Sequence, residues 1–137
     1  ALNIHMGLSP YYRGSACNFW ALYDNRPSYV GATIHMLSKG LDNGDILFHC
    51  TPELIDGDTS FDFTMRSVAA AHNDLVEVIN KYKIFLLPRM KQNKELEIRY
   101  TKNVDFNNEI VREFLERNMD IQDSKIEYPD FFKPLYL

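Results

Sequence analysis

Two strand-like segments that lie close together in the sequence set the strongest limit on how this chain can fold. Residues 30–37 are rich in β-branched and aliphatic side chains, and a second segment begins at Ile46 and is expected to run to about Leu54. The dipeptide Asn43-Gly44 between them is typical of a tight turn. The sequence therefore predicts an antiparallel two-stranded ribbon in this region.

Two helices are expected to pack against the strands. Residues 60–82 follow the capping side chains Asp58 and Thr59, and a shorter helix is expected from a Ser15 cap to about Asn25. Apolar spacing of three and four predicts one buried face on the long helix. That face would contain Phe61, Met65, Val68, His72, Leu75 and Ile79. Together with a strand over residues 1–5, these elements predict an α/β fold with one layer of strands packed on helices.

The last third of the sequence has a different character. We expect residues 1–88 to form one unit and residues 89–137 to form a linker and a short α/β extension. The extension would hold a strand over 97–100 and a helix over 107–118. Its aromatic tail is expected to dock on the protein itself or on a partner subunit, because an exposed patch of that kind is uncommon. The tail aromatics are Tyr128, Phe131, Phe132 and Tyr136.

Charge and cysteine content narrow the classes of protein. The net charge of −4 argues against a dedicated nucleic-acid surface, and the basic stretch 81–102 is more typical of a solvated linker. Cys17 and Cys50 lack metal-ligand spacing, and no apolar run reaches the ~20 residues of a membrane helix. No charged and then apolar segment at the start of the sequence suggests secretion. We therefore expect a reduced, cytoplasmic protein without a membrane partner. Ala1 to His5 reads as a strand already under way, so we expect a preceding partner half.

Asn3, His5 and Asp42 form the candidate chemical group. Residues two apart on a strand point to the same face, so Asn3 and His5 can address one reacting atom. Asp42, in the segment between two strands, could orient the imidazole. A carboxamide N–H and an imidazolium can stabilise an oxyanion while a carboxylate relays a proton. The group suits acyl transfer to an amine and needs no serine or cysteine nucleophile.

Other interpretations of these residues stay open. Asp-rich turns are common, so Asp42 could serve only the turn, although a calcium loop is disfavoured because its ligand ladder is missing. His35 is expected to be a packed or supporting residue. A metal site made of His35, His49 and Cys50 is disfavoured, since adjacent strand residues point to opposite faces.

The ordered motifs resemble those of the formyltransferase family that uses N10-formyltetrahydrofolate. The family's Asn-x-His motif matches Asn3-Ile4-His5, and its next loop matches Gly7-Leu8-Ser9-Pro10 with small-residue and Leu/Ser departures. Arg13-Gly14 and the strand motif Gly31-Ala32-Thr33-Ile34 follow. The family's Leu-Asp-x-Gly loop places its catalytic Asp at Asp42. The resemblance covers residues 1 to about 88 and implies the C-terminal portion of a Rossmann-like domain with a mixed sheet and an antiparallel ribbon.

The resemblance also implies ligands and roles. Asn3, His5 and Asp42 would be catalytic, N10-formyltetrahydrofolate would be the formyl donor, and no metal is implied. The donor would contact Ser38, Gly40, Leu41 and Asp42. The acceptor would contact Ser9, Pro10, Tyr12 and Arg13. The missing N-terminal half of the same domain would supply much of the folate pocket, and a homodimer is compatible with the aromatic tail.

The acceptor is expected to be the primary amine of a nucleotide-linked amino sugar. The alternative acceptor is methionyl-tRNA. In the methionyl-tRNA enzymes of the family a linker leads to a barrel that helps to hold tRNA, and the basic stretch 81–102 resembles that linker. Residues 101–137 contain eight Asp/Glu against five Lys/Arg, which suits a tRNA surface poorly. Further alternatives are formyltetrahydrofolate hydrolysis, in which water replaces the amine, and a fragment that binds without turnover.

Overall fold

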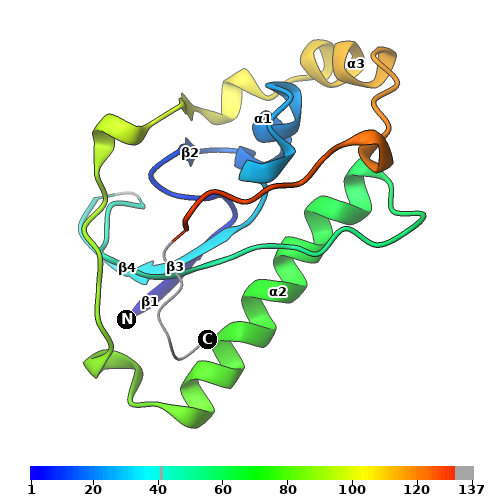
Figure 1. The fold of residues 1–137 in the computed structure, drawn as a ribbon. Helices are drawn as coiled ribbons and strands as arrows, with labels where there is room; N and C mark the ends of the chain where they lie inside the picture. The colour runs from blue at the N-terminus through cyan, green and yellow to red at the C-terminus, as the bar shows by residue number, and fades with distance from the viewer. Residues whose placement is uncertain (41, 132–137) are drawn as a thin grey trace.

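The computed structural model describes residues 1–40 and 42–131 (Figure 1). Three helices, five strands and several 3-10 turns are assigned in those residues. The strands are β1 Leu2–His5, β2 Tyr12–Gly14, β3 Ala32–Met36, β4 Ile46–Cys50 and β5 Arg99–Thr101. The helices are α1 Cys17–Tyr23, α2 Ser60–Lys81 and α3 Asn108–Glu116. The α/β class predicted from the sequence is confirmed.

The central sheet has the order β1-β3-β4, and both of its pairings are antiparallel. Helix α2 runs along one face of this sheet, as Figure 1 shows. Strand β1 is paired with β3 so that Asn3 lies opposite His35 and His5 lies opposite Thr33. The sheet thereby brings two histidines and an asparagine to neighbouring positions.

Strand β2 lies just after the Gly7–Pro10 loop, in a segment where no strand was expected. It pairs in parallel with β5, with Tyr12 opposite Arg99 and Gly14 opposite Thr101. A strand of three residues whose partner lies more than eighty positions away leaves no local periodicity to detect. The pairing ties the start of the chain to its last third.

The connection between β3 and β4 is longer than the tight turn expected at Asn43-Gly44. Strand β3 ends at Met36 and β4 begins at Ile46, so residues 37–45 join them. Gly44 serves a close approach, because a Cβ there would lie 1.6 Å from the carbonyl oxygen of Met36. Strand β4 also ends at Cys50, before the expected Leu54. The longer connection is what carries Asp42 back toward β1.

Helix α2 begins at the expected caps but buries a different face. Thr59 and Asp62 form a capping box. The buried residues are Phe63, Ser67, Ala71 and Val78. Phe61 is 71% exposed, and Met65, His72 and Ile79 are exposed as well. The helix has apolar residues on two stripes, and the small side chains of Ser67 and Ala71 suit the stripe that lies close to the sheet.

The Ser15 cap expected for α1 is wrong. Ala16 precedes the helix in a left-handed conformation (φ 52°) and gives no side-chain cap. The Ser15 hydroxyl donates instead to Asn103, in the turn that follows β5. The sequence could not show this competitor, which lies far along the chain.

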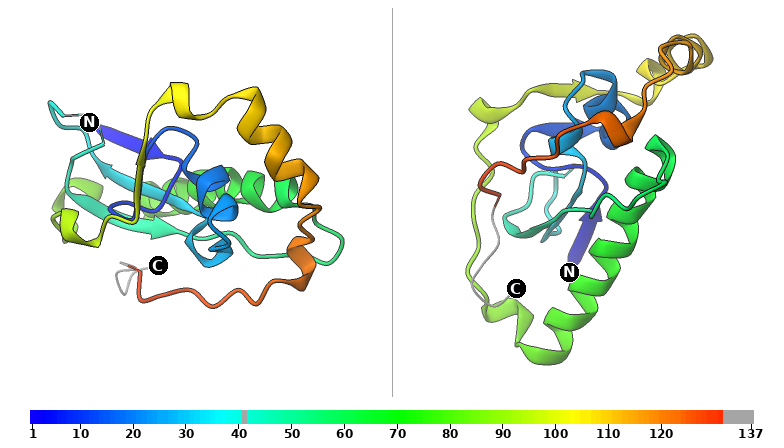
Figure 2. Two further views of the ribbon diagram at one scale, coloured as in Figure 1. Left: turned by 90° about the horizontal axis from the view of Figure 1, so that it is seen from above. Right: turned by 45° about the vertical axis from the view of Figure 1, so that its right-hand side comes forward.

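Residues of the last third pack on α1 in one hydrophobic cluster. Tyr12, Trp20 and Phe63 share it with Ile121, and Phe114 of α3 stacks edge-on against Phe19. The two views of Figure 2 show the segment after α3 running back across the molecule toward the strands. Phe131 docks edge-on to Tyr11 and Tyr29, which confirms that this part of the tail packs on the protein. Phe132 and Tyr136 lie outside the described residues.

Candidate active site

Asn3, His5 and Asp42 meet at strand β1. Asp42 reaches the strand from the 37–45 connection, where its own backbone is left-handed (φ 49°), a conformation that Asp tolerates better than most residues. Asp42 Oδ2 lies 3.3 Å from His5 Nδ1, and Asp42 Oδ1 accepts a hydrogen bond of 2.9 Å from Asn3 Nδ2. The three candidate catalytic residues therefore form one contact group.

His35 fixes the orientation of the Asn3 amide. Its Nδ1 lies 2.9 Å from the carbonyl oxygen of Met36, which can only accept, so Nδ1 carries the proton and Nε2 is left as an acceptor. Asn3 Nδ2 lies 3.0 Å from that Nε2. With a carboxylate on one side and an imidazole lone pair on the other, the nitrogen of the amide must face both. The amide oxygen is thereby turned away from Asp42 and His35.

This role for His35 is the main feature that the sequence left undefined. The ring is 1% exposed, and its Nε2 also lies 3.5 Å from Asp42 Oδ1. The expectation of a packed or supporting residue agrees with this placement. Its partner could be identified only once the β1–β3 register was known.

The electrostatics favour a charged pair. Burial alone would lower the pKa of His5, which is 6% exposed, but the hydrogen bonds with Asp42 and Cys17 and the charge of Asp42 raise it to about 10. The pKa of Asp42 is lowered, chiefly by its hydrogen bond to His5, with burial opposing the change. At neutral pH the pair is a carboxylate and an imidazolium.

Two cavities open beside the group. One of about 260 Å³ is lined by Asn3, His35, Ser38, Gly40 and Asp42 together with Leu37 and Lys39. The other, of about 360 Å³, is lined by Asp42, Tyr100, Lys102 and Asn103 together with Gly14, Ser15 and Thr101. Asp42 borders both, so the group can be approached from two sides. Leu41, expected to bind the donor, lies outside the described residues.

Gln92, which no sequence pattern singled out, holds the loop that carries Asp42. Its side-chain amide donates to the backbone oxygens of Asp42 (2.7 Å) and Gly44 (2.9 Å). Met90, two residues before Gln92, forms an antiparallel β-bridge with Ile46. This bridge brings the segment alongside β4. Residues 90–92 therefore brace the site from outside the strands.

The expected acceptor residues lie in different surroundings. Ser9, Pro10 and Tyr12 are buried. The amide N–H of Ser9 donates to Thr33, and the Tyr12 hydroxyl donates to Asp24. Arg13 is partly exposed, pairs with Glu97 at 2.9 Å and donates to Asn43, the neighbour of Asp42. Of these four side chains, Arg13 is the one that contacts the Asp42 loop.

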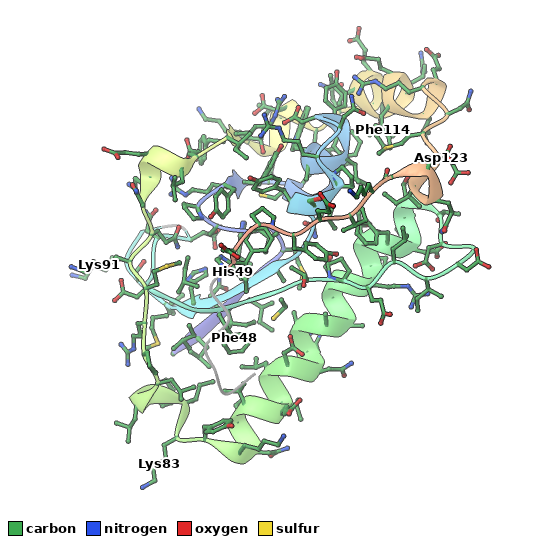
Figure 3. All side chains as sticks on the ribbon, in the orientation of Figure 1. Phe48, His49, Lys83, Lys91, Phe114 and Asp123 are labelled. Atoms are coloured by element: carbon green, nitrogen blue, oxygen red, sulfur yellow. The ribbon has the colours of Figure 1, made fainter. Side chains whose placement is uncertain are left out.

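Within residues 1–40 and 42–131, no group of three His, Cys, Asp or Glu side chains could hold a metal ion. Figure 3 shows Phe48 and His49 on opposite faces of β4, in agreement with the argument against a His49–Cys50 ligand pair. His49 Nε2 instead lies 2.6 Å from the backbone oxygen of Ser9. None of the described helices is both long enough and apolar enough to cross a membrane.

Comparison with known proteins gives a consistent result. The family model described as "Formyl transferase" matches residues 1–79. A methionyl-tRNA formyltransferase of Desulforamulus reducens is 32% identical over 95 residues, which cover 69% of this chain and 30% of that protein. A GDP-perosamine N-formyltransferase of Brucella melitensis is 33% identical over 81 residues, or 59% of this chain and 31% of that protein. The chain thus spans about a third of the length of these relatives.

Solved structures agree on the fold. The formyltransferase PseJ from Anoxybacillus kamchatkensis, in complex with UDP-4,6-dideoxy-4-formamido-L-AltNAc and tetrahydrofolate, matches 77% of this chain and 53% of its own. The TM-score is 0.64 and the sequence identity is 25%. A 4-N formyltransferase from Francisella tularensis matches 96% of this chain and 60% of its own, with a TM-score of 0.64 and 23% identity. The contact group Asn3–His5–Asp42 lies within the matched residues 1–79, and the chain belongs to the formyl transferase family.

Proposed function

We propose that this chain carries the catalytic residues of an enzyme that transfers a formyl group from N10-formyltetrahydrofolate to a primary amine. The proposal rests above all on the contact group of Asn3, His5 and Asp42, in which one carboxylate is bonded to both partners. Such a group can stabilise an oxyanion and move a proton without forming a covalent intermediate. The tetrahydrofolate complex of PseJ supports folate as the donor.

The roles follow from the contacts. The neutral amine attacks the formyl carbon, and the positive charge of the His5 imidazolium stabilises the oxyanion that forms. Both N–H groups of Asn3 are engaged by Asp42 and His35, so we assign its amide oxygen to accept a hydrogen bond from the attacking amine. Asp42 keeps His5 protonated and relays the amine proton toward the departing folate nitrogen. The formyl C–N bond to folate then breaks as the bond to the acceptor is completed.

The two cavities suit the two substrates. We assign the cavity with Ser38 and Gly40 to the folate, as the resemblance implies. The cavity with Tyr100 and Lys102 offers a cation beside an aromatic ring. That pair suits a nucleoside diphosphate, with the ammonium on phosphate and the ring against a base. Residues 89–137, proposed as an extension to the 1–88 unit, would then supply a wall of the acceptor site.

A nucleotide-linked amino sugar is therefore the acceptor we favour. The GDP-perosamine and PseJ relatives carry names that fit this class. Methionyl-tRNA is the second candidate, because the match to the methionyl-tRNA formyltransferase covers 69% of this chain, against 59% for the GDP-perosamine N-formyltransferase. Two cysteines without metal-ligand spacing suit a reducing cytoplasm as the place of the reaction.

An acceptor screen tests the proposal. The protein that contains this chain would be given N10-formyltetrahydrofolate with nucleotide-linked amino sugars, with methionyl-tRNA, or with no acceptor. We expect tetrahydrofolate release that depends on the amino sugar and a formylated sugar detected by mass spectrometry. Release with tRNA alone would favour the second candidate, and release without any acceptor would indicate a hydrolase. No release under all three conditions would overturn the proposed transfer.

A further inference from the structure

The imidazole of His5 has a partner on each nitrogen, and the second partner is Cys17. Cys17 Sγ lies 3.6 Å from His5 Nε2, on the other side of the ring from the Asp42 contact at Nδ1. Cys17 is 2% exposed. The ring is therefore held between a carboxylate and a thiol, and the backbone oxygen of Tyr12 also lies 3.3 Å from Nε2.

The local backbone leaves room for this contact. Gly7 has no side chain, and a Cβ there would lie 2.5 Å from Cys17 Cβ and 2.8 Å from His5 Nε2. Two left-handed residues precede Cys17, Gly14 (φ 89°) and Ala16 (φ 52°). For alanine this conformation is unfavourable, because the Cβ lies too close to the following carbonyl oxygen. The backbone is therefore strained at the turn that places Cys17 beside His5. Strained residues often cluster at functional sites.

The hydrogen-bond capacities match. A protonated His5 donates from Nε2 to Sγ and to the Tyr12 oxygen. A thiol can accept from His5 and still donate its own proton, and the backbone oxygen of Gly14 lies 3.5 Å from Sγ. We propose that Cys17 is a positioning residue that holds the Nε2 side of His5, while Asp42 holds the Nδ1 side. The importance of Cys17 for catalysis rests on the proposed formyl transfer. The contact by which Cys17 positions the His5 ring is independent of that proposal.

NMR titration of the four histidines in the 137-residue chain tests the proposal directly. The His5 signal, assigned by its loss in His5→Asn, would be followed in the wild type, Cys17→Ser and Cys17→Ala. We expect the pKa of His5 to fall in the order wild type, Cys17→Ser, Cys17→Ala, because serine keeps a shorter hydroxyl and alanine keeps no polar atom. Cys50→Ala is the matched control, since Cys50 is also buried but packs in a different hydrophobic cluster on β4. It should leave the His5 titration unchanged.

An unchanged His5 titration in Cys17→Ala would overturn the proposal, as would an equal change in Cys50→Ala. Should Cys17→Ala fail to fold, a Cys17→Ser variant that titrates like the wild type would overturn it as well. In the protein that contains this chain, Cys17→Ala should lower kcat by on the order of tenfold with little change in KM for folate, because the acid is misplaced rather than removed. If the wild-type protein shows no formyl transfer, the proposed function is refuted. The NMR titration would still test whether Cys17 positions His5.

Discussion

Asp42 uses both of its carboxylate oxygens in the site, one toward His5 and one toward Asn3. This sharing predicts how substitutions should combine. In the protein that contains this chain, Asn3→Ala, His5→Ala and Asp42→Ala should each reduce turnover by about a hundredfold or more, with smaller effects on folate binding. The double variants should lose much less than the product of the single losses, because the three residues act as a unit. Steady-state kinetics would measure this, and near-normal turnover in His5→Ala would rule out the proposed mechanism.

The shifted pKa of His5 has a consequence for stability. Its folded-state value, about 10, lies above the ordinary value of 6.5, so the folded state binds the proton more tightly than the unfolded state. The stabilisation is fully present below pH 6.5 and is lost as pH rises toward 10. The Asp42 pKa is lowered, so the stabilisation from this carboxylate is present above its ordinary value of 3.8 and is lost in acid. Urea unfolding of the 137-residue chain from pH 6 to pH 10 should show falling stability.

Asp42→Asn is the control for that titration. It removes the charge that holds the proton on His5 while it keeps a side chain that tolerates a left-handed backbone. The fall in stability between pH 6.5 and pH 10 should be smaller in this variant. An equal fall in both proteins would assign the pH dependence to other groups.

The grouping of Asn3, His5 and Asp42 was predictable in part because a strand alternates. Asn3 and His5 share a face of β1 by their spacing alone, and the ordered motifs pointed to Asp42. The register between β1 and β3 places His35 at the site. The segment that bridges to β4 brings Gln92 there, and a left-handed turn before α1 brings Cys17. None of these three arrangements leaves a periodic pattern in the sequence. Supporting residues therefore required the structure, whereas the central group did not.

At the scale of elements, α2 shows which features of a helix its sequence periodicity predicts and which it does not. Its length and its capped start were predicted to within a residue or two, since both depend on local side chains. Four of the six residues expected on its buried face are exposed, although Leu75 packs against the cluster of the sheet. Two apolar stripes compete on this helix, and only the sheet selects between them. Strand β2 and its parallel pairing with β5 were missed for the same reason, because the pairing is not local. The strand expected over residues 97–100 overlaps β5.

The two phenylalanines at the start of α2 test the corrected face. Phe63 is fully buried, and Phe61 is 71% exposed. Phe63→Ala should destabilise the chain by about 3–5 kcal/mol, whereas Phe61→Ala should change stability by no more than about 0.5 kcal/mol. Chemical denaturation of the two variants beside the wild type would measure the difference. Equal losses of stability in the two variants would indicate that Phe61 is buried, as the sequence analysis expected.

At the scale of the whole molecule, the sheet has one protected edge and one open edge within the described residues. Met90 bridges to Ile46 on β4, while β1 pairs with β3 alone. Large apolar side chains on the outer face of α2 are exposed as well. They include Phe61, Met65, Val76 and Ile79. An open strand edge and an apolar helix face are both surfaces on which further polypeptide can pack.

We therefore expect the isolated 137-residue chain to self-associate and to bind folate weakly. Pockets that enclose a ligand of drug size usually measure about 300–1,000 Å³ and bury most of its surface. The cavity proposed for the folate is only about 260 Å³. Sedimentation over a range of concentrations should show oligomers, and the double variant Val76→Lys, Ile79→Lys should shift them toward monomer without loss of fold, because both side chains are more than half exposed. Calorimetric titration should give weak folate binding in both proteins. A monomer that binds formyltetrahydrofolate tightly and turns over would show that these 137 residues already form a complete site, with β1 as a natural edge of the sheet.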